Sequence, residues 1–223
     1  MGTLGAYAKS ASAPDLSTVD ISVYPWSSIG KLNNSVGGAC TAAVIEPDKV
    51  LTAAHCIFNR RTNHFLLPSS LHILLGYERG EYALHALVGG YTIGPAYDPA
   101  REAATVSSDW VVLNLIEPLP SKIRPLKLVD QVPPQGSSLM IGSYARDRLH
   151  LMTADKCQLL ATLPRIPLLW HSCQVGLGSS GAPLLMMKGD AIVIVGMQVA
   201  IGRRPDGADV PLAVSAPSIA VSR

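Results

Sequence analysis

The chain has 223 residues, of which 48% are hydrophobic and 15% are charged, and its formal net charge is +2. This composition excludes a disordered chain, because soluble globular proteins usually carry about a quarter of charged residues. The basic residues form no run longer than the pairs Arg60-Arg61 and Arg203-Arg204, which gives no support to binding of nucleic acid or of an anionic membrane surface.

The start of the chain is predicted to stay outside the folded core. Residues 1–17 are rich in Ala, Ser and Gly and have no apolar pattern, so we interpret them as an N-terminal arm. The basic n-region and long apolar stretch of a signal peptide are absent from these residues. No segment of the sequence approaches the run of about 18 apolar residues that spans a bilayer, so we expect no membrane insertion.

Short apolar runs alternate with clusters of Gly, Pro, Asn and Asp along the rest of the chain. Many short strands separated by regular turn signals are typical of an all-β barrel or sandwich. A TIM barrel or a doubly wound sheet would need helical segments between the strands, and the apolar period of a helix is missing. In chain order, the predicted strands are 39–45, 50–53, 71–75, 83–88, 110–115, 139–141, 150–153, 168–172, 184–187 and 191–199.

The best candidate for a domain boundary is the proline-rich segment 116–120, since two prolines do not fit in a central strand. We therefore predict an arm at 1–17, a first domain at 18–117 and a second domain at 118–223. No internal repeat with a period of 20–50 residues is found.

Three short motifs carry the chemistry. Residues 52–56 read T-A-A-H-C, residues 107–110 read S-S-D-W, and residues 178–183 read G-S-S-G-A-P. A serine hydroxyl becomes a nucleophile when a base removes its proton, and histidine is the usual base. The order Ser, acid, His of α/β-hydrolases is excluded, because the last histidine is His171 and no base follows Ser180.

The order His55, Asp109, Ser180 resembles that of the chymotrypsin-like (trypsin-like) serine proteases. The resemblance implies two six-stranded antiparallel β-barrels with the active site in the cleft between them. It also implies a serine endopeptidase in which His55 is the general base, Asp109 orients it and Ser180 is the nucleophile. The backbone N–H groups of Gly178 and Ser180 would form the oxyanion hole.

Asp98 is a rival for the role of orienting acid, but an aspartate before proline usually begins a turn. Asp109 instead precedes an apolar strand, as the family's acid does. We assign no role to His64, His72, His85 or His150, and we consider His171 as a candidate pocket residue.

Four cysteines allow three disulfide pairings, and reduced thiols or a zinc site are the alternatives. The resembled family has a bridge equivalent to Cys40–Cys56, which leaves Cys157 with Cys173. No C-x-x-C or H-E-x-x-H spacing supports zinc, so we expect no metal and no cofactor. Disulfides imply an oxidising compartment, so we predict a secreted or periplasmic protein whose leader is not part of this sequence.

Two departures from the digestive members of the family concern activation. Ser179 stands where those proteins carry an aspartate that pairs with a new N-terminal ammonium, and the N-terminus lacks the Ile-Val-Gly-Gly start. The chain in this respect is more similar to the bacterial glutamyl-endopeptidase-like branch.

The predicted substrate pocket contains Gln174, Gln198 and Ala200, and its two walls lack Asp and Glu. We therefore expect a neutral pocket for uncharged side chains with Gln174 or Gln198 as the polar contact. Arg203 and Arg204 would favour acidic side chains if they reached it. We expect a monomer that acts on proteins or peptides; the alternative is a protease-like binding protein without catalysis.

Overall fold

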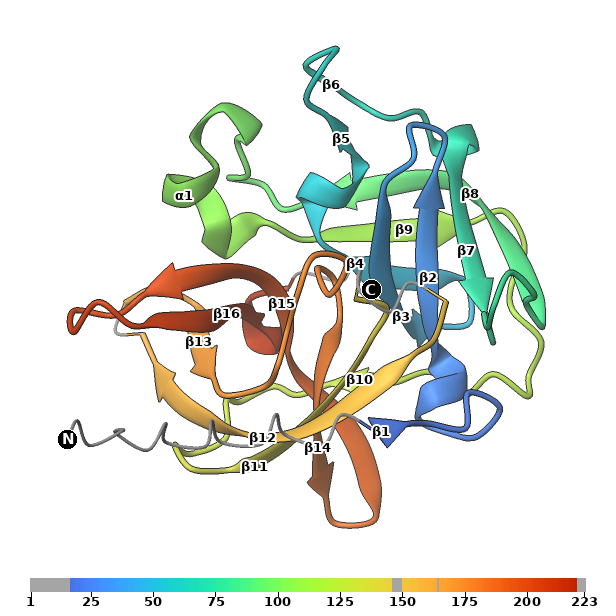
Figure 1. Ribbon diagram of the computed structural model, residues 1–223. Coiled ribbons are helices and arrows are strands. Elements are labelled where there is room, and N and C mark those ends of the chain that lie inside the picture. Colours follow the sequence, from blue (N-terminus) through green and yellow to red (C-terminus); the bar gives the residue numbers. More distant parts are fainter. Residues whose placement is uncertain (1–16, 146–149, 164, 220–223) are drawn as a thin grey trace, which may run out of the picture.

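The computed structural model describes residues 17–145, 150–163 and 165–219, and regular structure in these residues is mostly β-strand (Figure 1). The predicted arm lies outside the described residues except for Ser17. The strands are β1 (Ser17–Thr18), β2 (Ile29–Asn34), β3 (Ala39–Glu46), β4 (Lys49–Thr52), β5 (Phe58–Asn59), β6 (His64–Phe65), β7 (Leu71–Leu75), β8 (Leu84–Ile93), β9 (Val111–Leu115), β10 (Lys127–Leu128), β11 (Ser138–Ser143), β12 (Thr153–Thr162), β13 (Leu168–His171), β14 (Pro183–Lys188), β15 (Ala191–Arg203) and β16 (Asp209–Ser215).

The first barrel is closed in the strand order β2-β3-β4-β9-β8-β7, and all its pairs are antiparallel. Alternating side chains of each strand point into the barrel. Leu71, Ile73 and Leu75 of β7 are almost fully buried in this way. They pack with apolar residues of β3, β4 and β9 into one core.

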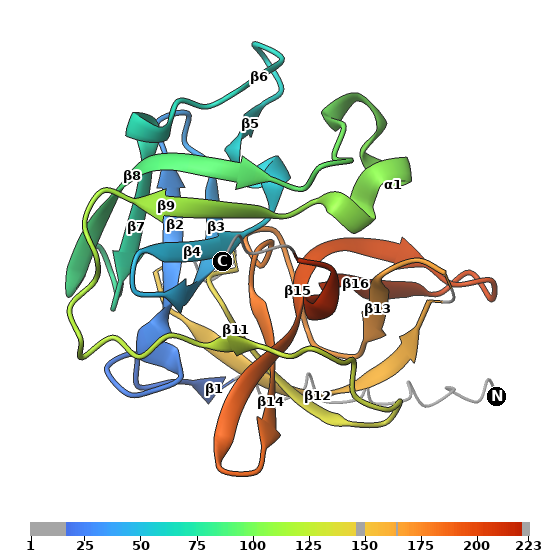
Figure 2. The same ribbon diagram turned by 180° about the vertical axis from the view of Figure 1, so that it is seen from behind.

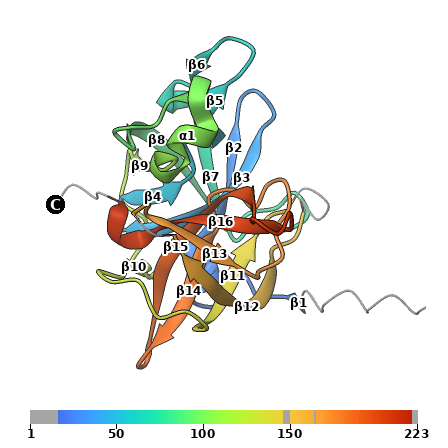
Figure 3. The ribbon, with the colours of Figure 1, turned by 90° about the vertical axis from the view of Figure 1, so that its left-hand side faces the viewer.

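The second barrel has the order β12-β11-β14-β15-β16-β13 and closes through the pairing of β12 with β13. Figure 2 shows β15, β16 and β13 of this barrel from behind. The short strand β10, labelled in Figure 1, pairs in parallel with β15. The side view shows the two barrels against each other (Figure 3). The predicted fold of two six-stranded antiparallel barrels is therefore confirmed.

In the part of the chain that the structure describes, helical structure is limited to single turns. The helix α1 (Glu102–Thr105) follows the 3₁₀ turn Pro99–Arg101 and precedes the 3₁₀ turn Val106–Ser108. Further 3₁₀ turns are Trp26–Ser28, Ala54–Ile57, Pro68–Ser70 and Ala216–Ser218. Within the described residues, no helix has the length and apolar character needed to cross a membrane.

The predicted strand at 150–153 is wrong except for Thr153. Residues 150–152 form a turn, and β12 begins at Thr153 and runs to Thr162. Strands β2 and β16 are absent from the prediction. The turn Lys188-Gly189-Asp190 joins β14 to β15: Lys188 pairs with Ala191, and Gly189 has a φ of +60°.

The division at 117/118 remains a prediction, because segments on both sides of it contact the other barrel. β1 precedes the first barrel in sequence but pairs with β12 of the second. In the opposite direction, the N–H of Leu126 donates to the carbonyl of Val44 in β3 at 2.9 Å.

Candidate active site

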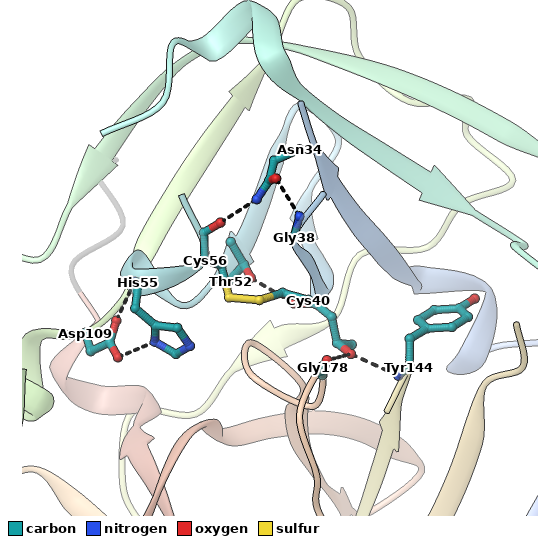
Figure 4. Close-up of a disulfide and its surroundings, with 10 residues drawn as sticks. Asn34, Gly38, Cys40, Thr52, His55, Cys56, Asp109, Tyr144 and Gly178 are labelled. Carbon is teal, nitrogen blue, oxygen red and sulfur yellow. Dashed lines mark hydrogen bonds and ion pairs between the residues drawn. A yellow bond between two sulfur atoms is a disulfide. The ribbon is translucent and has the colours of Figure 1, made fainter. Parts of the chain in front are cut away.

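His55 lies in the 3₁₀ turn Ala54–Ile57, directly after β4. Its position is fixed on both sides. Ala53 and Ala54 are fully buried, and Cys56 forms a disulfide with Cys40 of β3 (Figure 4). The side chain of Asn34 donates to the carbonyl of Cys56 at 3.1 Å. The chain thus holds the histidine at the edge of the first barrel.

Asp109 follows the 3₁₀ turn Val106–Ser108 and precedes the buried Trp110 and β9. Both of its carboxylate oxygens contact His55 (Figure 4). Oδ2 lies 2.6 Å from the ring atom Nδ1, and Oδ1 accepts the backbone N–H of His55 at 2.9 Å. This double contact fixes the plane of the imidazole and places the proton of the neutral ring on Nδ1, which leaves Nε2 as a base.

The rival acid, Asp98, does not contact His55 through any hydrogen bond of the described residues. Its carboxylate accepts from the backbone N–H of Ala100 and from Nε of Arg101, both within 2.9 Å. Asp98 therefore caps the turn Pro99–Arg101, as its place before a proline indicates.

The pKa of His55 is set by opposing effects. Burial lowers the pKa of the ring, but the hydrogen bond and the negative charge of Asp109 outweigh burial and raise the net pKa above its ordinary value. Glu102 adds a further small increase, and Arg60 a small decrease. These two residues form an ion pair of 2.7 Å beside the histidine, a feature that the motifs of the sequence do not indicate.

Ser180 lies in a tight loop between β13 and β14 that is bound to the first barrel. Its carbonyl accepts the N–H of Thr41 in β3 at 2.9 Å, and the hydroxyl of Thr41 donates to the carbonyl of Gly178 at 3.0 Å. Gly178 and Gly181 have φ values of +96° and +83°, a region that glycine adopts without strain. The small residues of the motif therefore allow the loop geometry.

The two predicted oxyanion donors remain available. Within the described part of the chain, neither the N–H of Gly178 nor that of Ser180 donates to a protein acceptor. The carbonyl of Gly178 is turned toward Thr41. Ser180 Oγ makes no hydrogen bond with His55 among these residues, but both residues line the same cavity. Such catalytic contacts are often long in unliganded enzymes.

Ser179 is fully buried beneath this loop. Its hydroxyl lies 3.0 Å from the hydroxyl of Ser143 in β11 and accepts the N–H of Gly176 at 3.2 Å. Neutral hydroxyls thus hold the loop at the position where digestive relatives use an aspartate.

A cavity of about 560 Å³ joins the predicted site residues. It is lined by His55, Asp109 and Ser180 and, of the predicted pocket residues, by Gln198 and Ala200. Gln174 does not line it; the backbone N–H of Gln174 instead donates to Asp155. The same cavity has an apolar wall of Val175, Leu177, Val199 and Ile201.

The arginines just beyond the pocket strand are paired with acidic neighbours. Arg203 contacts Asp209 at 3.2 Å, and Arg204 contacts Asp206 at 3.1 Å. None of the four lines the cavity. These side chains therefore supply neither a cation nor a carboxylate to its wall.

Both predicted disulfides, Cys40–Cys56 and Cys157–Cys173, are present. Each lies close to a histidine, His55 in one case and His171 in the other. Disulfide sulfurs are not thiolates, and zinc binds thiolates, so these two clusters do not form zinc sites while the bridges are intact.

Two closed barrels with a histidine, an aspartate and a serine on one cavity are the arrangement of chymotrypsin-like hydrolases. The comparisons with known proteins agree with this fold. The structure of a Glu endopeptidase in complex with MPD superposes with a TM-score of 0.77 and 17% sequence identity, and the match covers 92% of each chain. A comparison with curated proteins finds no match.

The family model described as Trypsin matches residues 17–166, which is more than half of the chain. The chain therefore belongs to the trypsin family of serine proteases. The matched segment includes His55 and Asp109 and ends before Ser180.

Proposed function

We propose that this protein is a secreted serine endopeptidase that cleaves peptide bonds through an acyl-enzyme intermediate. The observation that carries the proposal is the pair of contacts between Asp109 and His55, on the cavity that Ser180 also lines. Membership of the trypsin family supports the reaction class, and the two disulfides support an oxidising compartment.

In the proposed reaction, Ser180 Oγ attacks the carbonyl carbon of the scissile bond while His55 Nε2 takes the hydroxyl proton. The carbonyl oxygen becomes negatively charged and accepts the free N–H groups of Gly178 and Ser180. Each such donor contributes about 3–4 kcal/mol to lowering the barrier. His55 then gives its proton to the leaving amine as the C–N bond breaks.

Water completes the cycle. His55 removes a proton from a water molecule, which attacks the ester carbon of acyl-Ser180. The bond between this carbon and Ser180 Oγ then breaks, the acid product leaves, and the proton passes from His55 to Ser180 Oγ. The carboxylate of Asp109 stabilises the imidazolium formed in each half of the reaction. The buried contact between Asp109 and His55 keeps the ring oriented in both halves.

Labelling with a fluorophosphonate tests the proposal, because this probe phosphonylates only an activated serine. We expect intact-protein mass spectrometry to show one adduct on the native chain and none on Ser180→Ala. Ser137→Ala, a serine outside the cavity, should still be labelled. A native chain that remains unlabelled at neutral pH would contradict catalysis and favour the protease-like binding protein.

A further inference from the structure

A buried glutamine that lines the cavity contacts a buried histidine, and neither takes part in the proposed reaction. His171 of β13 is fully buried, and Gln198 of β15 is 3% exposed. The ring atom Nε2 of His171 and the side-chain oxygen Oε1 of Gln198 lie 2.7 Å apart. A polar pair so completely removed from water needs a reason beyond packing.

The surroundings of His171 determine which of its ring atoms carries the proton. The backbone N–H of Cys173 points at Nδ1 at 3.3 Å, and an N–H group donates only, so Nδ1 is the acceptor. The proton of the neutral ring is therefore on Nε2, which donates to Gln198. Burial lowers the pKa of His171 to about 4, although its hydrogen bond to Gln198 acts in the opposite direction, so the ring is neutral at ordinary pH.

This histidine in turn fixes the orientation of the Gln198 amide. Oε1 faces the donor on His171, and one N–H of the amide donates to the carbonyl of Ala200 at 2.8 Å. The reversed amide would place two donors together at His171 and two acceptors together at Ala200. The second N–H of the amide has no partner among the described residues.

Gln198 lines the cavity, so the charged groups of the cavity bear on what could pair with this N–H. The ionisable residues on the cavity are already paired: Asp109 with His55, and Arg60 with Glu102. A substrate carboxylate would therefore enter without a free cation, at a high desolvation cost. A substrate Lys or Arg would meet two carboxylates, those of Asp109 and Glu102, that are already paired with His55 and Arg60, and Oε1 of Glu102 is buried without a hydrogen-bond partner in the described part of the chain.

The position of Gln198 links this amide to one particular substrate residue. The carbonyl of Gln198 accepts the N–H of Gly181, the residue after the nucleophile, at 2.8 Å. A side chain that reaches this amide therefore belongs to the residue whose carbonyl Ser180 attacks.

We infer, on the basis of the proposed function, that Gln198 selects glutamine as the residue immediately before the scissile bond. The N–H of Gln198 donates to the side-chain carbonyl of the substrate glutamine, whose methylene groups contact the apolar wall. His171 is a positioning residue, because it acts by holding the amide of Gln198 with its N–H toward the cavity. A substrate without an acceptor leaves this buried donor unpaired.

The test compares peptides that differ only at this residue, which is Gln, Met, Leu or Glu. Methionine matches glutamine in length but lacks the carbonyl. We expect kcat/KM for the Gln peptide to exceed that for each of the others by about 10-fold or more, since a site built for a hydrogen bond rejects analogues that lack it. Equal rates for Gln and Met, or faster cleavage of the Glu peptide, would overturn the inference.

Three variants test whether Gln198 and His171 cause the preference for glutamine. Gln198→Met should bring the Gln and Met peptides to similar kcat/KM while it retains cleavage of the Met peptide. Gln174→Met is the matched control, because Gln174 does not line the cavity, and should retain the preference. His171→Leu should also lose the preference for Gln. A thermal melt checks that His171→Leu is folded; if it is not, the result for Gln198→Met alone decides the test. Retention of the preference by Gln198→Met would overturn the assignment.

Fluorophosphonate labelling separates the two proposals, because the probe carries no side chain for the pocket. A native chain that is labelled but cleaves the four peptides equally keeps the proposed function and loses the glutamine preference. A native chain that is not labelled loses both.

Discussion

Both carboxylate oxygens of Asp109 contact His55. Replacement of Asp109 by asparagine therefore tests whether the charge of this side chain is needed in addition to its shape. Asparagine is similar in shape but offers an N–H₂ group in place of one oxygen, so the proton of His55 is expected to move to the wrong ring nitrogen. We predict that Asp109→Asn lowers kcat by about 10⁴-fold. Asp98→Asn is the control and should leave kcat near its native value; the reverse pattern in steady-state kinetics would show that the orienting acid is misassigned.

The same contact predicts the pH dependence of catalysis. His55 acts as a base only when its ring is neutral, so kcat/KM rises with pH through its pKa. The hydrogen bond and charge of Asp109 raise that pKa against the effect of burial. In the native chain the acid limb of the pH profile should lie above the ordinary histidine pKa of about 6.5, and the residual activity of Asp109→Asn should have its limb at lower pH. An unshifted limb would contradict this assignment.

Gly181 is required for steric reasons as well as for its backbone conformation. A Cβ atom at this position would lie 2.1 Å from the carbonyl oxygen of Thr41 and 2.2 Å from the hydroxyl of Thr52, at a φ of +83°. Gly207 has the same φ but no heavy atom within 4 Å of its virtual Cβ. Comparison of alanine substitutions at Gly181 and Gly207 therefore separates the effect of steric crowding from that of backbone strain.

We predict that Gly181→Ala lowers the free energy of unfolding by about 1–3 kcal/mol more than Gly207→Ala does, because overpacking adds to the strain that both share. Urea unfolding of the two variants measures the difference. Equal losses would show that the loop around Ser180 yields to accommodate the methyl group.

At the scale of elements, the strands that sequence patterns identify are those with continuous apolar runs, such as β7 and β9. β2 was missed because its sequence, I-G-K-L-N-N, looks polar, although Lys31 is 6% exposed and its ammonium lies over the ring of Tyr77. β16 contains Pro211, which usually argues against a strand. Pro211 lies beyond the residues that pair with β13, so its missing N–H breaks no bond to that neighbour.

In the candidate site, too, the sequence predicts local motifs but not contacts between distant strands. The motifs around His55, Asp109 and Ser180 are local in sequence and were identifiable without a structure. The contact between His171 and Gln198 joins residues 27 positions apart on different strands, and neither residue belongs to a motif. Only the register of the second barrel brings them together.

The disulfide Cys40–Cys56 joins β3 to the turn that carries His55. Replacing both cysteines by alanine removes a cross-link between residues 16 positions apart, which chain-entropy arguments value at about 3 kcal/mol. We predict a loss of that order in the free energy of unfolding, measured in urea, together with a lower kcat.

The second bridge provides the comparison. Cys157–Cys173 has the same sequence separation of 16 but lies in the other barrel, so its removal should cost similar stability and leave the position of His55 unaffected. If removing Cys40–Cys56 changed neither unfolding nor kcat, the bridge would have no role in holding the histidine.

At the scale of the whole molecule, Thr41 of the first barrel holds the loop around Ser180 in the second. Its N–H and hydroxyl donate to the carbonyls of Ser180 and Gly178, and its hydroxyl also accepts the N–H of Tyr144. Thr41→Val retains the shape and leaves the half-buried carbonyl of Gly178 and the buried N–H of Tyr144 unpaired; an unpaired buried group costs about 1–3 kcal/mol. We predict that this variant is less stable in urea and loses most of its fluorophosphonate labelling; unchanged labelling would show that the loop holds its form unaided.

The position of Thr41 also bears on how the two halves of the molecule lose their structure. Trp110 is buried in the first barrel and Trp170 lies in β13 of the second, so each reports on one barrel by its fluorescence. Because the loop around Ser180 is completed by a strand from the opposite barrel, opening of either barrel dismantles it. The protein should therefore unfold as one cooperative unit, and the less stable barrel determines how long the environment of Ser180 lasts.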